Sequence, residues 1–218
     1  MIITKRKENP EILNKLTGNV KKVFLVGCGE CATVCKTGGE NELNDLENFL
    51  TSNNIDVVAK TIVDATCNEP GAGLKLRKLK EEKRQADAFI VMSCGAGVQA
   101  ITEKVEANQL VLPGCDSLFL GNIKRINDYN QKCSTCGECI IGDFGGLCPV
   151  TRCPKGLLNG PCGGSVNEKC EVDADNPCIW IVIYQRLKGL GQLENLDKFY
   201  EPKNNKSRTN PSSVKVER

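Results

Sequence analysis

Short apolar runs alternate with amphipathic segments over the first 128 residues. The runs have the length and composition of buried strands, and they lie at residues 20–26, 55–63, 88–92 and 109–112. Between them, apolar residues recur at helical spacing, starting near residue 31 and again over 41–53, 71–85 and 98–106. Strands separated by helices predict a parallel sheet with crossover helices. We therefore predict an α/β domain over residues 1–128, built on a small Rossmann-like parallel sheet with flanking helices.

The pattern changes after residue 128, where periodic segments give way to cysteine, glycine and proline. We predict a cysteine-rich C-terminal lobe of loops and helices over residues 129–200, and a polar, disordered tail over 201–218. One segment around Trp180 is a helix that is apolar nearly all round, so core packing competes with a docking face for a partner subunit. The first dozen residues are expected to be mobile or to form an arm.

Charge and composition exclude several classes of protein. The net charge is +2, and 26% of the residues are charged, which leaves no basic stripe for nucleic acid. No apolar run reaches the length of a membrane span. The first residues lack the apolar stretch of a secretory signal, so we expect a cytoplasmic protein.

Fourteen cysteines and the absence of histidine define the chemistry. Without imidazole, the chain lacks a Cys/His zinc finger, a Ser–His or Cys–His catalytic pair and a histidine haem ligand. Thiolates are soft ligands, and closely spaced thiolates converge on one inorganic centre, so we predict sulfur-ligated metal, above all iron–sulfur. A disulfide framework is the competing interpretation, but it is typical of short secreted domains rather than a chain of this length.

The first predicted metal site lies at one edge of the sheet. Each predicted strand ends within a few residues of a cysteine, and these are Cys28, Cys67, Cys94 and Cys115. Ligands of parallel sheets bind at the carboxyl ends of the strands, where these cysteines gather. Cys28, Cys31 and Cys35 supply three ligands, with Cys94 preferred as the fourth because its turn is flanked by glycine, and Cys67 as the alternative. Cys115 is left open between a ligand and a buried small hydrophobe.

The same region resembles a dinucleotide fingerprint. Residues 27–32 read G-x-G-x-x-A after a strand. Cysteines on both sides of the second glycine are unusual for a pyrophosphate turn, and no convincing ribose-binding acid follows. Glycines that serve a tight turn around a metal centre explain the same residues, so we do not predict dinucleotide binding.

The second predicted metal region is the cysteine-rich lobe. Cys133-x2-Cys136-x2-Cys139 matches the opening of a bacterial ferredoxin run, although Cys148-Pro149 follows after eight residues instead of three. Structural zinc is the alternative, because Cys133/Cys136 and Cys148/Cys153 form two close pairs. The lobe holds eight cysteines, enough for two four-ligand centres or for one centre plus structural thiols: Cys133, Cys136, Cys139, Cys148, Cys153, Cys162, Cys170 and Cys178.

Specific strings in this lobe resemble a known family. They are GLCPVTRCPKGLLNGPCGG from residue 146, then KCEV and PCIWIVIYQRL, ending at residue 187. The chain is similar to the methylenetetrahydrofolate reductase C-terminal domain family, which includes MetV-type small subunits of MetVF reductases. The front half shares the resemblance through VGCGECATVC, so that it covers about residues 15 to 190.

The resemblance implies a role that the residues alone do not give. Such subunits carry 4Fe–4S clusters, here two or more, and in some cases zinc. They accompany a MetF-like catalytic subunit that holds FMN or FAD and reduces methylenetetrahydrofolate. The expected function is an accessory or electron-transfer subunit in one-carbon metabolism of the acetyl-CoA (Wood–Ljungdahl) pathway, with ferredoxin or further electron-transfer subunits as partners. The alternative is a zinc-stabilised structural or docking module of a corrinoid or folate methyl-transfer complex. No catalytic residue is predicted in this chain.

Overall fold

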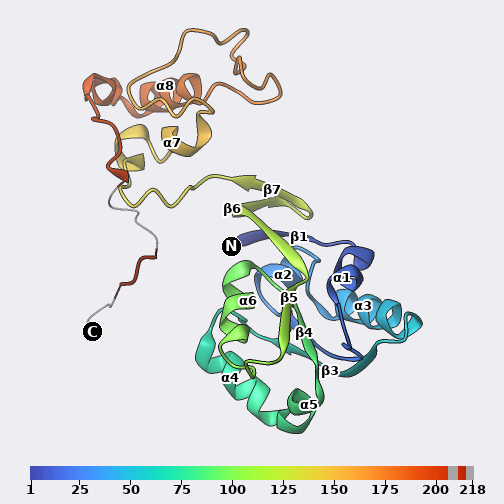
Figure 1. The fold of residues 1–218 in the computed structure, drawn as a ribbon. Helices are drawn as coiled ribbons and strands as arrows, with labels where there is room; N and C mark the ends of the chain where they lie inside the picture. Colours follow the sequence, from blue (N-terminus) through green and yellow to red (C-terminus); the bar gives the residue numbers. More distant parts are fainter. Residues whose placement is uncertain (206–210, 215–218) are drawn as a thin grey trace. The chain divides into compact units, whose positions relative to one another are not determined.

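The computed structural model describes residues 1–205 and 211–214 (Figure 1). The chain divides into two compact units. Unit 1 comprises residues 1–119 and 123–129, and unit 2 comprises residues 120–122 and 130–218. Residues 206–210 and 215–218 of the predicted disordered tail lie outside the described residues.

Unit 1 is built on a four-stranded parallel sheet. The strands are β2 (Lys22–Cys28), β3 (Asp56–Val63), β4 (Ala88–Met92) and β5 (Leu110–Pro113), in the order β3-β2-β4-β5. Each of the four apolar runs in the sequence forms one of these strands, and the two central strands, β2 and β4, are buried almost throughout. The predicted α/β fold with a parallel sheet and flanking helices is therefore confirmed.

Helices cover both faces of this sheet. Val23 and Leu25 of β2 pack in one apolar cluster with α3 (Glu40–Ser52) and with Ile12 of α1 (Asn9–Lys15). Phe24 and Val26 point to the opposite face, where they meet α4 (Glu69–Lys78) and α6 (Gly95–Thr102). The alternation follows from the two-residue period of a strand, and it gives the sheet two separate cores.

The predicted helix over 71–85 is two helices. α4 ends at Lys78, and α5 (Lys80–Gln85) follows after Leu79, whose φ of −115° and ψ of 42° are not helical. α4 begins two residues earlier than predicted, because the Asn68 side chain accepts a hydrogen bond from the Gly71 N–H and caps the helix. α5 buries no residue, which shows why the apolar pattern weakens there.

A second sheet was not predicted. β1 (Ile2–Arg6), β6 (Cys115–Arg125) and β7 (Asp128–Gln131) form it in the order β1-β6-β7. The expectation of a mobile N-terminal arm is wrong, because Ile3 is buried and the Thr4 hydroxyl lies 2.6 Å from the Thr37 hydroxyl.

Unit 2 has little regular structure. Its elements are η1 (Ile141–Phe144), α7 (Pro149–Arg152), α8 (Ile179–Leu190) and η2 (Leu193–Asp197). Its apolar core consists mainly of one face of α8 packed on Phe144, whose ring meets the Trp180 ring edge-on at 5.4 Å. Core packing thus accounts for Trp180, which is 4% exposed. None of the helices in the described part of the chain has the length and apolar character that a membrane span requires.

Candidate metal centre

The carboxyl ends of the parallel strands bring several cysteines to one edge of unit 1. Cys28 is the last residue of β2 and pairs with Val63 at the end of β3, while Gly27 pairs with Met92 at the end of β4. From β2 the chain crosses to β3 on one side, and later to β4 on the other. The topological switch point therefore lies between the carboxyl ends of β2 and β4. Open α/β sheets bind their ligands at this point.

Cys28 lies at this edge, and its surroundings stabilise the thiolate form of its side chain. Burial disfavours the thiolate, but hydrogen bonds from the Thr66 hydroxyl and from the N–H groups of Thr66, Glu30 and Ala32 outweigh it. Together they hold the pKa of Cys28 below its ordinary value. Donors that converge on sulfur are what a metal-bound thiolate requires.

Cys67 lies within electrostatic range of three other cysteines. Its pKa is raised, first by burial and then by the negative charge of Cys94, Cys28 and Cys31. We call Cys28, Cys31, Cys67 and Cys94 the rim set. Cys94 precedes α6 and Cys67 precedes the α4 cap, so both enter from the loops that follow the strands. Cys67 is predicted from the sequence only as an alternative ligand, because it lies four residues after the end of β3 and the path of that loop cannot be read from the sequence.

Cys35 and Cys115 have different surroundings. The Cys35 sulfur lies 4.0 Å from the Ile2 carbonyl oxygen and interacts with the Tyr129 hydroxyl. Cys115 is buried in the apolar core beside α3, where its thiol donates to the Thr37 carbonyl at 3.3 Å and burial raises its pKa to about 12. Of the two roles that the sequence left open for Cys115, the structure therefore favours the buried small hydrophobe.

The glycines near Cys28 serve close packing. A Cβ atom on Gly27 would stand 2.6 Å from the Gly38 carbonyl oxygen, which is too close for any side chain. The helix that follows, α2 (Cys31–Val34), has only four residues. A dinucleotide fingerprint needs a helix long enough to present its N-terminus to a pyrophosphate, so these glycines have a packing explanation instead.

In unit 2, hydrogen bonds join the ferredoxin-like run to Cys148. The Thr151 hydroxyl donates to the Ser134 hydroxyl at 3.1 Å, and the Cys148 sulfur lies 3.7 Å from the same Thr151 oxygen. Ser134 follows Cys133 directly, so this chain of contacts ties Cys148 to the loop. We call Cys133, Cys136, Cys139 and Cys148 the run set. Cys133 and Cys139 are exposed, and Cys136 and Cys148 are half-buried.

The remaining four cysteines of unit 2 line one small cavity of about 20 Å³. We call them the cavity set: Cys153, Cys162, Cys170 and Cys178. The backbone fixes two of them, since the Cys170 N–H donates to the Asn176 carbonyl at 3.0 Å and the Cys178 N–H to the Glu168 carbonyl at 2.8 Å. These bonds close residues 168–178 into a hairpin-like loop against the start of α8.

The environment of Cys162 favours a thiolate. The Gly164 N–H is the main cause of a lowered pKa for this thiol, and the Lys155 ammonium adds to it. Lys155 also forms an ion pair with Glu171, whose carboxylate lies 3.5 Å from the Cys162 sulfur. A cation and a backbone donor beside the cavity suit a centre that carries net negative charge.

The donor chemistry fits sulfur-ligated metal in all three sets, although the thiols are not drawn together at ligand distances. Over residues 1–205 and 211–214, no group of three or more Cys, Asp or Glu side chains has the geometry of a formed metal site. Because Zn–S bonds are about 2.3 Å long, four thiolates would have to close inward around an ion. What the fold supplies is looser grouping. The cavity set lines one cavity, Cys67 interacts with the other three members of the rim set, and hydrogen bonds tie Cys148 to the residue after Cys133.

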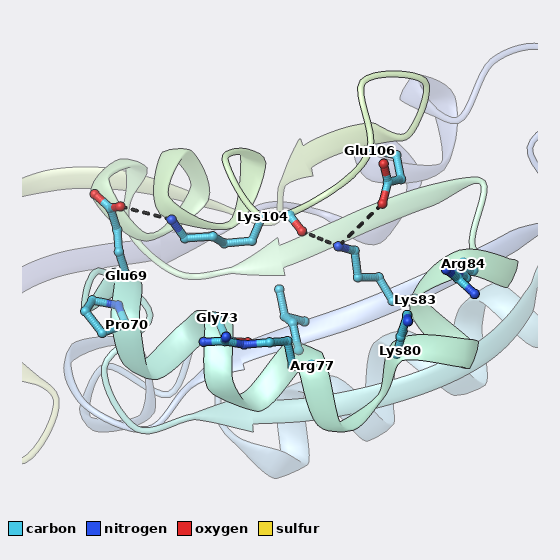
Figure 2. Close-up of a pocket in the computed structure, with 10 residues that line it drawn as sticks. Glu69, Pro70, Gly73, Arg77, Lys80, Lys83, Arg84, Lys104 and Glu106 are labelled. Atoms are coloured by element: carbon cyan, nitrogen blue, oxygen red, sulfur yellow. Dashed lines mark hydrogen bonds and ion pairs between the residues drawn. The ribbon is translucent and has the colours of Figure 1, made fainter.

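A larger cavity of unit 1 carries no thiol. It measures about 470 Å³ and lies between α4, α5 and the loop that precedes β5, with several basic side chains around it (Figure 2). Figure 2 shows that Lys104 is paired with Glu69 at 3.1 Å and that Lys83 reaches Glu106 at 3.8 Å. Its charges are partly neutralised by these pairs, and no cysteine lines it.

One comparison with known proteins bears on unit 2. Residues 112–206 match the family model described as Methylene-tetrahydrofolate reductase C terminal. The match is to less than half of the chain, but it includes all eight cysteines of the run set and the cavity set. No curated protein and no solved structure matches the chain. The link to methylenetetrahydrofolate reductase that the sequence suggested is therefore supported for this segment, and the rim set is argued from the fold alone.

Proposed function

We propose that this chain is an iron–sulfur accessory subunit that passes electrons to a flavin-containing methylenetetrahydrofolate reductase. The observation that carries the proposal is the division of twelve cysteines into three sets of four, at the sheet edge, in the ferredoxin-like run and around the small cavity. The family match of residues 112–206 supports the link to the reductase.

Four thiolates are the usual ligand number of a 4Fe–4S cluster, which takes up and releases one electron at a time. Reduction of methylenetetrahydrofolate to methyltetrahydrofolate needs two electrons and two protons. Clusters held by these thiolates would relay single electrons from a donor such as reduced ferredoxin to a flavin on the MetF-like partner, and that flavin would supply the two-electron chemistry. The chain's own residues hold the sulfurs and supply N–H donors and cations around them.

Metal analysis of single variants tests the proposal. We expect that Cys31→Ser, Cys136→Ser and Cys170→Ser each remove one centre, about four iron and four sulfide atoms, from protein purified without oxygen. Cys115→Ser is the matched control, because Cys115 lies in the apolar core, and it should retain the full metal content. If all three ligand variants keep the iron of the unchanged chain, the grouping is wrong.

A zinc-stabilised structural or docking module is the second candidate, and the cavity set favours it. A volume of about 20 Å³ is close to the space that one small ion or water occupies, whereas a cubane cluster needs the surrounding loops to move apart. Zinc without acid-labile sulfide, in protein that is colourless, would establish this function and exclude the electron-transfer role.

A further inference from the structure

Trp180 carries a polar group that the fold does not satisfy. The side chain is 4% exposed, and its indole nitrogen Nε1 is fully buried. Within the described residues, this N–H has no hydrogen-bond partner. Buried donors in native proteins nearly always have an acceptor, so an orphaned indole N–H points to a missing group.

Trp180 and the four cysteines line the same small cavity, and Cys178 stands two positions before Trp180 at the start of α8. Trp180 also lines a second cavity of about 360 Å³, which no cysteine lines. The two charged side chains of the cavity, Lys155 and Glu171, are paired with each other. A thiol sulfur is a weak acceptor, whereas a metal-bound thiolate or sulfide is a strong one.

We propose that the indole N–H of Trp180 donates a hydrogen bond to a metal-bound sulfur of the centre that the cavity set holds. The inference rests on one part of the proposed function, namely that metal binds at Cys153, Cys162, Cys170 and Cys178. It holds equally for a zinc tetrathiolate and for a cluster, because both present anionic sulfur. Trp180 is thus a positioning residue, which orients and stabilises the ligand sulfurs together with the Gly164 N–H and the Lys155 ammonium.

A purely structural role would not need the N–H. The Trp180 ring packs edge-on against Phe144, a contact that an analogue of the same ring shape retains. The two roles are therefore separated by an analogue that keeps the ring shape and removes the donor. Benzothienylalanine does this, since sulfur replaces the indole N–H, and Trp180 is the only tryptophan of the chain.

Nuclear magnetic resonance of the full chain tests the bond directly. With ¹⁵N-labelled tryptophan the chain gives one indole N–H signal, and ¹¹³Cd²⁺ serves as the diamagnetic probe of thiolate sites. We expect the indole proton to move downfield on loading and to show scalar coupling to ¹¹³Cd through the hydrogen bond. In Cys170→Ser the signal should stay in its metal-free position, while cadmium at the other sets is retained.

The affinity for cadmium provides the second readout. Removing an outer hydrogen bond to a metal ligand typically weakens metal binding by about 10- to 100-fold, and we expect at least about tenfold from benzothienylalanine at position 180. The matched control is Ile183→Val, which trims the buried core of the same helix and leaves the donor in place. It should bind cadmium as the unchanged chain does.

The outcomes separate this inference from the proposed function. If cadmium binds the cavity set but the indole signal and the affinity of the analogue are unchanged, the Trp180 inference is refuted and the metal centre stands. If Cys162→Ser and Cys170→Ser retain all the cadmium of the unchanged chain, no centre exists at the cavity, and both fall.

Discussion

Gly38→Ala offers the sharpest test of how the rim set is assembled. Gly38 is buried in the segment that follows α2, the short helix that begins at Cys31. Its carbonyl accepts a hydrogen bond from the Cys28 N–H at 3.1 Å. A Cβ atom at this position would stand 1.9 Å from the Met92 carbonyl oxygen at the end of β4. This oxygen belongs to the backbone and cannot rotate aside as a side chain could. The loop and the strand must therefore separate by roughly 1 Å to accommodate the Cβ atom.

The magnitude follows from this geometry. Overpacking in a buried site costs about 1–3 kcal/mol, and a clash with backbone places Gly38→Ala near the upper end. With a urea dependence of about 2 kcal/mol per molar, a loss of about 3 kcal/mol lowers the unfolding midpoint of unit 1 by about 1.5 M. The shift also moves Cys28 and Cys31 away from Cys94, so the protein should lose the metal of the rim set.

The chain offers a matched control for the same chemical change. Gly73 lies in α4, and a Cβ atom there would meet nothing closer than 3.9 Å. Gly73→Ala should therefore stabilise unit 1 by about 0.5–1 kcal/mol through helix propensity. Far-ultraviolet circular dichroism follows unit 1, and fluorescence of Trp180 follows unit 2. A Gly38→Ala midpoint equal to that of the unchanged chain would refute the contact between the loop and β4.

Three further predictions concern the cysteines and one carboxylate. Cys67→Ser should lower the metal content by one centre and Cys35→Ser should not, because Cys67 interacts electrostatically with the other members of the rim set. Iron analysis of both variants checks this, and the reverse pattern of iron loss would contradict it. A strong chelator should unfold unit 2, seen by Trp180 fluorescence, and leave the circular dichroism of unit 1 largely intact, since unit 2 has the smaller core. Asp143→Asn should lower the unfolding midpoint at pH 7, because Lys198 holds the pKa of this carboxyl below its ordinary value. This contribution is present above about pH 4 and is lost as the pH falls through the lowered pKa, so the difference from the unchanged chain should vanish in acid.

The parallel sheet could be predicted because its two central strands, β2 and β4, are buried on both faces. Val23 to Val26 and Ala88 to Met92 have no solvent-facing side, so the sequence marks them as uninterrupted apolar runs. β6 and β7 escaped prediction for the opposite reason. Most of their residues are half-buried or exposed, and polar residues such as Lys124 and Asn130 leave no apolar periodicity to detect.

The sequence predicts that the candidate site lies at one edge of the sheet, and its set of ligands stays a prediction. Parallel topology alone carries Cys28 and Cys94 to the same edge, and this needs only the order of strands and helices. The surroundings of Cys35 and Cys67 depend on how two loops turn. Cys35 is close to Cys31 in sequence, yet it faces Ile2 and Tyr129, which belong to the sheet that the sequence did not reveal.

The two units differ in the apolar core that each builds. Unit 1 has two apolar cores, one on each face of the sheet, so we expect its folding not to depend on the rim set. The rim set lies at the switch point of this sheet, where open α/β sheets bind their ligands. Unit 2 has one small core around α8, and most of its loop residues are exposed, so the ordering of those loops costs more than this core offsets. A metal bound by the cavity set would add folding energy there, because Cys178 immediately precedes α8. In the proposed function, electron exchange belongs to the rim set and the exposed run set, and the zinc alternative assigns structural support to the cavity set.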